Sequence, residues 1–172
     1  VEAPDCLGVY GGPAIPGASC SDGNPNTALD AYNSNCVCAG VACTTDLELE
    51  INTDANPGQN TWELRQEGTG QLAQSGGGLL PPGCVGCFDP TCLPDGTFYL
   101  RVFDSGGDGI VNGGYTLRVA GANGARIIDN RRDSQGIGGF TGGSESTVAG
   151  NLGFSIPVST DRMVFTSCDK LD

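Results

Sequence analysis

From residue 46 onward the chain carries short runs in which apolar and polar residues alternate, and this alternation predicts half-buried β-strands. In the first run, Leu47, Leu49 and Ile51 alternate with Glu48 and Glu50. Comparable strand-like runs lie at residues 62–65, 98–103, 115–119, 125–128, 154–158 and 163–165. Turn residues separate these runs, and no amphipathic helix is visible. The pattern predicts an all-β fold, namely a jelly-roll-like β-sandwich.

Residues 1–43 have a different character, because they show no lasting periodicity and are rich in Gly, Pro, Asn and Asp. Such a segment cannot hold itself together by apolar burial, so we expect disulfides to do it. Its cysteines are Cys6, Cys20, Cys36, Cys38 and Cys43. Four of them would form two bridges, and the sequence leaves three connectivities open. The predicted organisation is a disulfide-rich loop segment at 1–43, followed by the sandwich at 44–160.

Residues 161–172 are predicted to form a terminal strand. It pairs either with the open sheet edge of a neighbouring subunit or domain, or with the chain's own sheet. Cys168 is the odd ninth cysteine, and an unpaired thiol in a secreted chain indicates a partner beyond this sequence. In the alternative, Cys168 pairs internally and another cysteine stays free. The Gly-rich stretch at 136–150 is interpreted as a long loop, with a disordered linker as the alternative.

Composition narrows the function classes. The formal net charge is −12, which argues against nucleic acid and anionic membrane surfaces as partners. The chain has no histidine, so the usual general base and the commonest zinc ligand are both missing. No apolar run approaches the roughly 20 residues that a membrane-spanning helix needs. Nine cysteines in an acidic chain predict an oxidising location, either extracellular or at the cell surface.

Two acidic loops, at residues 53–57 and 104–109, carry the strongest chemical signal, and each follows an alternating run. Two aspartates of the second loop lie four residues apart, and carboxylates this close repel each other unless a cation lies between them. Hard oxygens on a glycine-permitted tight turn suit Ca²⁺. The alternative is that Asp and Gly only form good turns. The predicted calcium ligands are the side chains of Asp54, Asn56, Asp104 and Asp108, completed by backbone carbonyls such as that of Ile110.

Cysteine spacing places these two loops relative to each other. Cys43 lies eleven residues before Asp54, and Cys92 lies twelve residues before Asp104. If the two intervening strands run alongside each other in the same direction, one end of the sandwich carries a Cys43–Cys92 disulfide and the opposite end carries both acidic loops. Cys84 and Cys87, which lie between these two cysteines in the sequence, would then form a tight local loop or pair. The alternative is that Cys84, Cys87 and Cys92 form part of a zinc or redox site.

A second calcium site is predicted in the N-terminal segment. Asp22, Asn24 and Asn26 occupy alternate positions, as in the first half of known calcium loops, and Asp30 follows them. The glutamate that closes an EF-hand loop is missing at this place. The alternative is an Asx-turn tied between disulfides.

Catalysis finds little support in the sequence. A Ser or Cys nucleophile would lack its usual histidine base. Asp104 and Asp108 could hydrolyse glycosides as a carboxylate pair, but at this spacing we expect them to share a cation. Trp62, Tyr99 and Tyr115 could offer an aromatic platform for sugars, although Trp62 on its alternating strand fits a core position better. We therefore expect a binding or structural protein and not an enzyme.

Several motifs resemble those of one group of proteins. Segments 5–9, 16–27 and 35–40 are similar to the Cys/Asp-rich spacer of very large secreted surface proteins of Bacteroidota. A β-module of the same proteins resembles the segments Thr53-Asp54 to Trp62-Glu63-Leu64, Cys92-Leu93-Pro94-Asp95-Gly96 and Asp104-Ser105-Gly106-Gly107-Asp108-Gly109-Ile110. Together they cover most of residues 5–120. The module often has Glu where this chain has Asn60, which affects one possible calcium ligand. It often has a second Cys where this chain has Thr97, which changes the disulfide set.

The resemblance implies an adhesin or a component of an extracellular matrix or fibre. Together with the residue patterns, it predicts a non-catalytic structural subunit of an extracellular fibre or adhesin, with Ca²⁺ bound at the loops. The expected partners are further copies of the chain, as in a homo-polymer, or neighbouring domains of a longer one. One alternative is a calcium-dependent carbohydrate-binding module, with glycans as partners. The other is an accessory domain of a secreted hydrolase.

Overall fold

The computed structural model describes residues 2–52, 54–78, 87–110, 113–121, 124–132, 135–136, 138–146, 153–159 and 164–165. These ranges contain strands and one short 3₁₀ turn, η1, but no α-helix. The elements are β1 (Thr27–Tyr32), β2 (Cys38–Ala42), β3 (Thr45–Asn52), η1 (Pro57–Gln59), β4 (Asn60–Gln66), β5 (Leu72–Gly77), β6 (Cys87–Leu93), β7 (Gly96–Asp104), β8 (Gly114–Val119), β9 (Arg126–Arg131), β10 (Phe154–Ile156) and β11 (Val164–Phe165).

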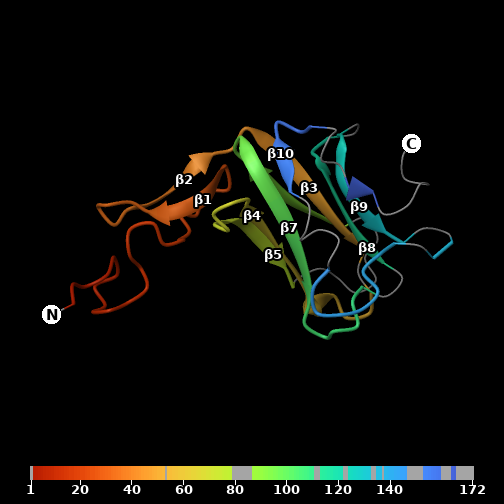
Figure 1. The fold of residues 1–172 in the computed structure, drawn as a ribbon, viewed down its shortest axis with the longest axis horizontal. Coiled ribbons are helices and arrows are strands. Elements are labelled where there is room, and N and C mark those ends of the chain that lie inside the picture. The colour runs from red at the N-terminus through yellow and green to blue at the C-terminus, as the bar shows by residue number, and fades with distance from the viewer. Residues whose placement is uncertain are drawn as a thin grey trace.

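Two sheets form the body of the molecule (Figure 1). The first has four strands in the order β10-β7-β4-β5, and the second has five in the order β11-β9-β8-β3-β6. Neighbouring strands in both sheets are antiparallel, except β9 and β11, which run parallel. The prediction of an all-β sandwich is confirmed.

The core lies between the sheets and consists of the apolar members of the alternating runs. In β3, Leu47, Leu49 and Ile51 are fully buried, while the polar residues between them are half-buried on the outer face. In β7 the buried residues are Phe98, Leu100, Val102 and Asp104. Each apolar side chain taken out of water contributes roughly 25 cal/mol per Å². Alternation along these strands therefore fixes which face of each sheet turns inward.

Four strands lie where the alternation predicted none, and they are β1, β2, β5 and β6. β6 pairs with β3 and carries Pro90 opposite Glu48. Proline cannot donate a ladder hydrogen bond, so it is tolerated here because β6 is an edge strand. β5 has the sequence Leu-Ala-Gln-Ser-Gly-Gly, whose residues have weak strand propensity. Pairing with β4 stabilises it as a strand.

Residues 2–43 form a small unit beside the sandwich, called the N-terminal unit below (Figure 1). It contains the β1–β2 hairpin, and Ala14 and Ala28 are its only buried hydrophobic residues. Two disulfides close its loops, and a third joins its end to β6 at the position that the spacing predicted. The pairs are Cys6–Cys36, Cys20–Cys38 and Cys43–Cys92.

The N-terminal unit covers the outer edge of β5. Gln71 donates a hydrogen bond from Nε2 to the carbonyl of Leu29 (2.9 Å), and Gln74 donates one to the carbonyl of Thr27 (2.8 Å). Side chains of the sandwich thus donate hydrogen bonds to backbone carbonyls of β1. The contact also shields an edge strand, which otherwise presents unpaired backbone groups to other chains.

The described part of the terminal segment pairs within its own chain. In β11, Val164 and Phe165 lie beside Ile128 and Asp129 of β9, which is the second of the two pairings that the sequence allowed. The rest of 161–172, including Cys168, lies outside the described residues, as do Cys84 and the side chain of Cys87. The described part of the stretch 136–150 is loop, except that Glu145 bridges to Phe103 of β7.

Candidate functional site

The two predicted acidic loops lie at the end of the sandwich opposite the Cys43–Cys92 disulfide. β3 and β7 both start near this disulfide, where Thr44 Oγ1 donates to Asp95 Oδ1 (2.6 Å). Both strands run from there to the acidic loops, which is the arrangement that the spacing predicted. They belong to facing sheets, however, and are not neighbours in one sheet. We call residues 54–60 and 104–110 the acidic end.

Strand β4, which pairs with β7, brings the two loops together. After the turn at Asp54, η1 leads into β4, whose first residue, Asn60, pairs with Asp104 at the end of β7. Next to this pair, Ser105 donates its backbone N–H to the carbonyl of Gln59 (3.0 Å). The ladder between β4 and β7 therefore fixes the distance between the two loops.

Asp104 is the centre of the acidic end. Its side chain faces the interior, and the residue is 1% exposed. Its carboxylate accepts hydrogen bonds from the backbone N–H groups of Gly106 (3.1 Å) and Gly109 (2.7 Å). Gly109 has φ +74°, and a Cβ at this position would collide with the backbone of Phe140. None of the ion pairs among the described residues includes Asp104, so its buried charge is held by backbone dipoles alone.

Asn60 is not among the predicted ligands, although the resemblance marks its position as that of a possible calcium ligand. It lies directly opposite Asp104, is fully buried, and neither its Oδ1 nor its Nδ2 has a hydrogen-bond partner among the described residues. A buried amide without partners costs about 1–3 kcal/mol. The signal in the sequence is positional, because Asn60 precedes Trp62 and Leu64 on the inward-facing side of β4.

The other predicted ligands differ in exposure, because Ile110 is fully buried, Asp54 is half-buried and Asp108 is exposed. Asp54 Oδ1 accepts a hydrogen bond from the backbone N–H of Asn56 (2.8 Å), and Asn56 itself is exposed. Asp108 is exposed as well, and its Oδ1 lies above Gly106, where the Gln59 side-chain oxygen also lies. The carbonyl of Ile110 accepts a hydrogen bond from the N–H of Gly113 (3.0 Å).

The described residues contain no cluster of three or more Asp, Glu, Cys or His side chains arranged to hold a metal. A cation at the acidic end would need mixed ligands, namely the Asp104 carboxylate together with amide and backbone oxygens. Calcium accepts such a set of hard oxygens. The residues present fit a calcium ion, because the unpartnered amide of Asn60 lies next to a buried carboxylate.

At the second predicted site the carboxylates bind the chain itself. Asp22 accepts hydrogen bonds from the N–H of Asn24 (2.8 Å) and from Thr27 Oγ1 (3.1 Å). Asn24 Oδ1 accepts from the N–H of Asn26 (3.1 Å), and Asp30 Oδ2 accepts from the N–H of Asp22 (3.0 Å). The hydrogen bond from Asn24, first of all, lowers the pKa of Asp22. These contacts match the Asx-turn alternative.

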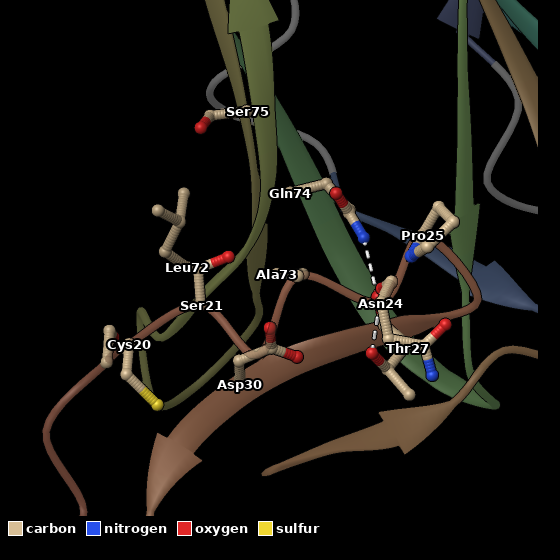
Figure 2. A pocket seen from close by; sticks show the side chains of 12 residues that line it. Cys20, Ser21, Asn24, Pro25, Thr27, Asp30, Leu72, Ala73, Gln74 and Ser75 are labelled. Atoms are coloured by element: carbon tan, nitrogen blue, oxygen red, sulfur yellow. Dashed lines mark hydrogen bonds between the residues drawn. The ribbon is translucent and has the colours of Figure 1, made fainter. Parts of the chain in front are cut away.

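Two of these residues, Asn24 and Asp30, line a cavity of about 340 Å³ between the N-terminal unit and β5 (Figure 2). On the β5 side, Leu72 to Ser75 form its wall. Asp30 Oδ1 is buried and has no hydrogen-bond partner among the described residues. The cavity therefore brings together one carboxylate and one amide of the predicted set, whereas Asp22 and Asn26 do not line it.

The three aromatic residues considered as a sugar platform do not share a surface. Trp62 and Tyr115 are buried in the core, and the Tyr115 hydroxyl lies 2.6 Å from Ser146 Oγ. Tyr99 is half-buried on the outer face of β7. A platform made of these three residues is therefore excluded.

Comparison with known proteins adds no family. No family model, no curated protein and no solved structure matches the chain. No helix in the described ranges is long and apolar enough to cross a bilayer. Three disulfides are typical of proteins from oxidising, extracellular environments.

Proposed function

We propose that the chain is a non-catalytic structural subunit of an extracellular fibre or cell-surface adhesin, which calcium and disulfides stabilise. The proposal rests on the pairing of Asp104 with Asn60 at the acidic end. Both residues are almost fully buried, the carboxylate has no cationic partner among the described residues, and the amide has no partner there at all. Buried charges in proteins are usually paired or coordinate a metal.

A calcium ion at this position would serve a structural purpose. It would link the loop that follows β3 to the loop that follows β7, and these strands belong to facing sheets. Asp104 and the amide oxygen of Asn60 would supply buried ligands, with Asp54 and Asp108 as the more exposed ones. Extracellular calcium modules bind with Kd on the order of 10⁻⁴ to 10⁻³ M, so millimolar calcium would keep the site filled.

One feature favours assembly into a larger structure. Strand pairing at the edges of β5 and β6 is disfavoured, because β1 covers the edge of β5 and Pro90 lies in the edge strand β6, so the contact surface is expected elsewhere. In the described part of the chain, all large hydrophobic residues with high exposure belong to the N-terminal unit, and exposed apolar surface often marks a contact site. These residues are Leu7, Val9, Tyr10, Ile15, Val37 and Val41.

Thermal unfolding with and without calcium tests the proposal. At about 10 mM calcium the expected stabilisation is ~1.4–2.7 kcal/mol, which corresponds to a rise in Tm of several degrees. Asp104→Asn should lose most of this rise. Asp46→Asn, an exposed aspartate near the disulfide end, should keep it and serves as the matched control.

The same samples should be imaged by electron microscopy and sized by sedimentation. Filaments or concentration-dependent oligomers in calcium are expected. A chain that stays monomeric at all concentrations contradicts the fibre role, and a Tm that is the same in calcium and EDTA contradicts the calcium role.

A further inference from the structure

A cleft of about 370 Å³ opens at the acidic end, on the outer face of the four-stranded sheet. Three separate segments form it: the turn before β4, the end of β7 with its loop, and the stretch that contains Glu145. Its lining residues are Gly58, Gln59, Thr61, Phe103, Asp104, Ser105, Ser144 and Glu145. Asp104 is also a predicted calcium ligand, but it is only 1% exposed and its side chain faces the interior.

Strand register explains why these side chains meet. Thr61 of β4 lies opposite Phe103 of β7, and Phe103 lies opposite Glu145 through an isolated bridge. Two backbone hydrogen bonds fix this bridge. Asp104 N–H donates to the Ser144 carbonyl (3.0 Å), and Ser146 N–H donates to the Val102 carbonyl (2.8 Å). The residues on both sides of Phe103 in β7 point inward, so the row from Thr61 to Glu145 points outward.

Phe103 presents a fixed aromatic surface in this cleft. The Arg101 guanidinium carbon lies 4.6 Å from the centre of the Phe103 ring. Arg101 is itself held in place by Glu145, with contacts of 2.7 and 2.8 Å, and lies 3.7 Å from Glu63. The ring therefore does not need to be ordered by a ligand, which lowers the entropic cost of binding.

Ion pairing also determines the charge of the cleft. The hydrogen bond from Arg101 lowers the pKa of Glu145, so this carboxylate is ionised at neutral pH and its charge is offset by the neighbouring guanidinium. Asp104 also belongs to the lining but is almost fully buried, and the other polar side chains of the lining residues are neutral, namely two serines, one threonine and one glutamine. The chain as a whole carries a net charge of −12, which disfavours anionic ligands.

An aromatic ring beside hydroxyl, amide and paired carboxylate groups suits a ligand with one apolar face and many hydroxyl groups. Small-molecule sites generally combine an apolar surface with a few placed polar groups, and this cleft lies near the lower end of their usual range of 300–1,000 Å³, at about 370 Å³. We propose that the cleft binds a pyranose ring of a neutral glycan, with its C–H face on Phe103 and its hydroxyls toward Thr61, Ser144 and Glu145. This goes beyond a structural role, because it gives the subunit a surface ligand.

Ligand-observed NMR of the whole chain tests the cleft. The probes are methyl glycosides of glucose, galactose, mannose, N-acetylglucosamine, fucose and xylose, in calcium and again in EDTA. We expect at least one of them to bind. Phe103→Ala should weaken this binding by at least about tenfold, which equals ~1.4 kcal/mol. Tyr99→Ala, the matched control on the same strand and outer face, should leave it unchanged.

A second variant protects the test against loss of the fold. Thr61 is exposed, so Thr61→Val removes one hydroxyl with little change in volume and should still weaken binding. Amide shift perturbations by the bound sugar should centre on residues 59–61, 103–105 and 144–145. Binding that persists in EDTA supports the cleft independently of calcium. No binding by any probe, equal binding by Phe103→Ala, or perturbations centred on the cavity of Asp30 would each overturn the proposal.

Discussion

The N-terminal unit and the sandwich are held together by different forces. The sandwich buries leucine, isoleucine and aromatic side chains between two sheets, whereas the N-terminal unit buries only Ala14 and Ala28. In place of a core, the unit has two disulfides and aspartates that accept backbone hydrogen bonds. Asp5, for example, accepts from the N–H groups of Leu7, Val9 and Ala14 (2.9–3.1 Å).

This contrast shows how chain composition decides the means of stabilisation. A segment of about 40 residues cannot bury enough apolar surface to offset its loss of conformational entropy. Covalent links and local carboxylate turns reduce that loss without a core. The same kind of substitution should therefore change the free energy of unfolding by very different amounts in the two regions.

Removal of a buried leucine should give the largest effect. Leu100 is fully buried between the sheets, so Leu100→Ala should lower the free energy of unfolding by about 2–5 kcal/mol. Leu7→Ala in the N-terminal unit should change it by less than about 0.5 kcal/mol, because Leu7 is 68% exposed. Urea unfolding followed by the fluorescence of Trp62, the only tryptophan, measures both. Equal losses in the two variants would contradict the comparison.

Disulfide removal should give an intermediate effect that depends on the region. The double variant Cys43→Ser with Cys92→Ser removes the covalent link between the N-terminal unit and β6, whose cysteines lie 49 residues apart, and should lower the free energy of unfolding by about 2–4 kcal/mol. Cys20→Ser with Cys38→Ser should open the β1–β2 hairpin and leave the Trp62 transition in place. Amide hydrogen exchange in β1 and β3 distinguishes the two double variants. Loss of protection in β3 when Cys20 and Cys38 are replaced would contradict the prediction.

Acid should have the smallest and most local effect. The pKa of Asp5 lies below its ordinary value of 3.8, first because of the hydrogen bond from Val9. The stability that this carboxylate contributes is therefore complete above pH 3.8 and is lost as the pH falls through the lowered value. The amide shifts of Leu7, Val9 and Ala14 should follow this titration by NMR, and Asp5→Asn should remove the dependence. A midpoint at or above 3.8 would contradict the hydrogen-bond pattern.

The sandwich was predictable from sequence wherever one face of a strand is buried and the other is not. β3 and β7 show this alternation, and both were predicted within a few residues. β5 and β6 do not show it, because glycines and Pro90 interrupt them. Their partners β4 and β3 impose the extended conformation, and pairing between distant segments leaves no periodic signal.

The acidic end was predictable in outline, because its aspartates follow recognisable strands at matched distances from two cysteines. The role of Asn60 was not, since an asparagine before a strand usually belongs to a turn. Its burial comes from the pairing of β4 with β7. Asp22 is the opposite case, a predicted ligand whose carboxylate accepts hydrogen bonds from Asn24 and Thr27 of its own chain. The spacing that suits calcium also suits such turns.

The Cys43–Cys92 bond has a mechanical consequence. Tension applied through the N-terminal unit passes from Cys43 through the sulfurs to Cys92 near the end of β6, so the covalent path of the load bypasses β3. The chain between the two cysteines, 49 residues in separation, stays outside the loaded path. Roughly 160–180 Å of extensible length is thereby withheld, and a pulled molecule would yield in its other segments first.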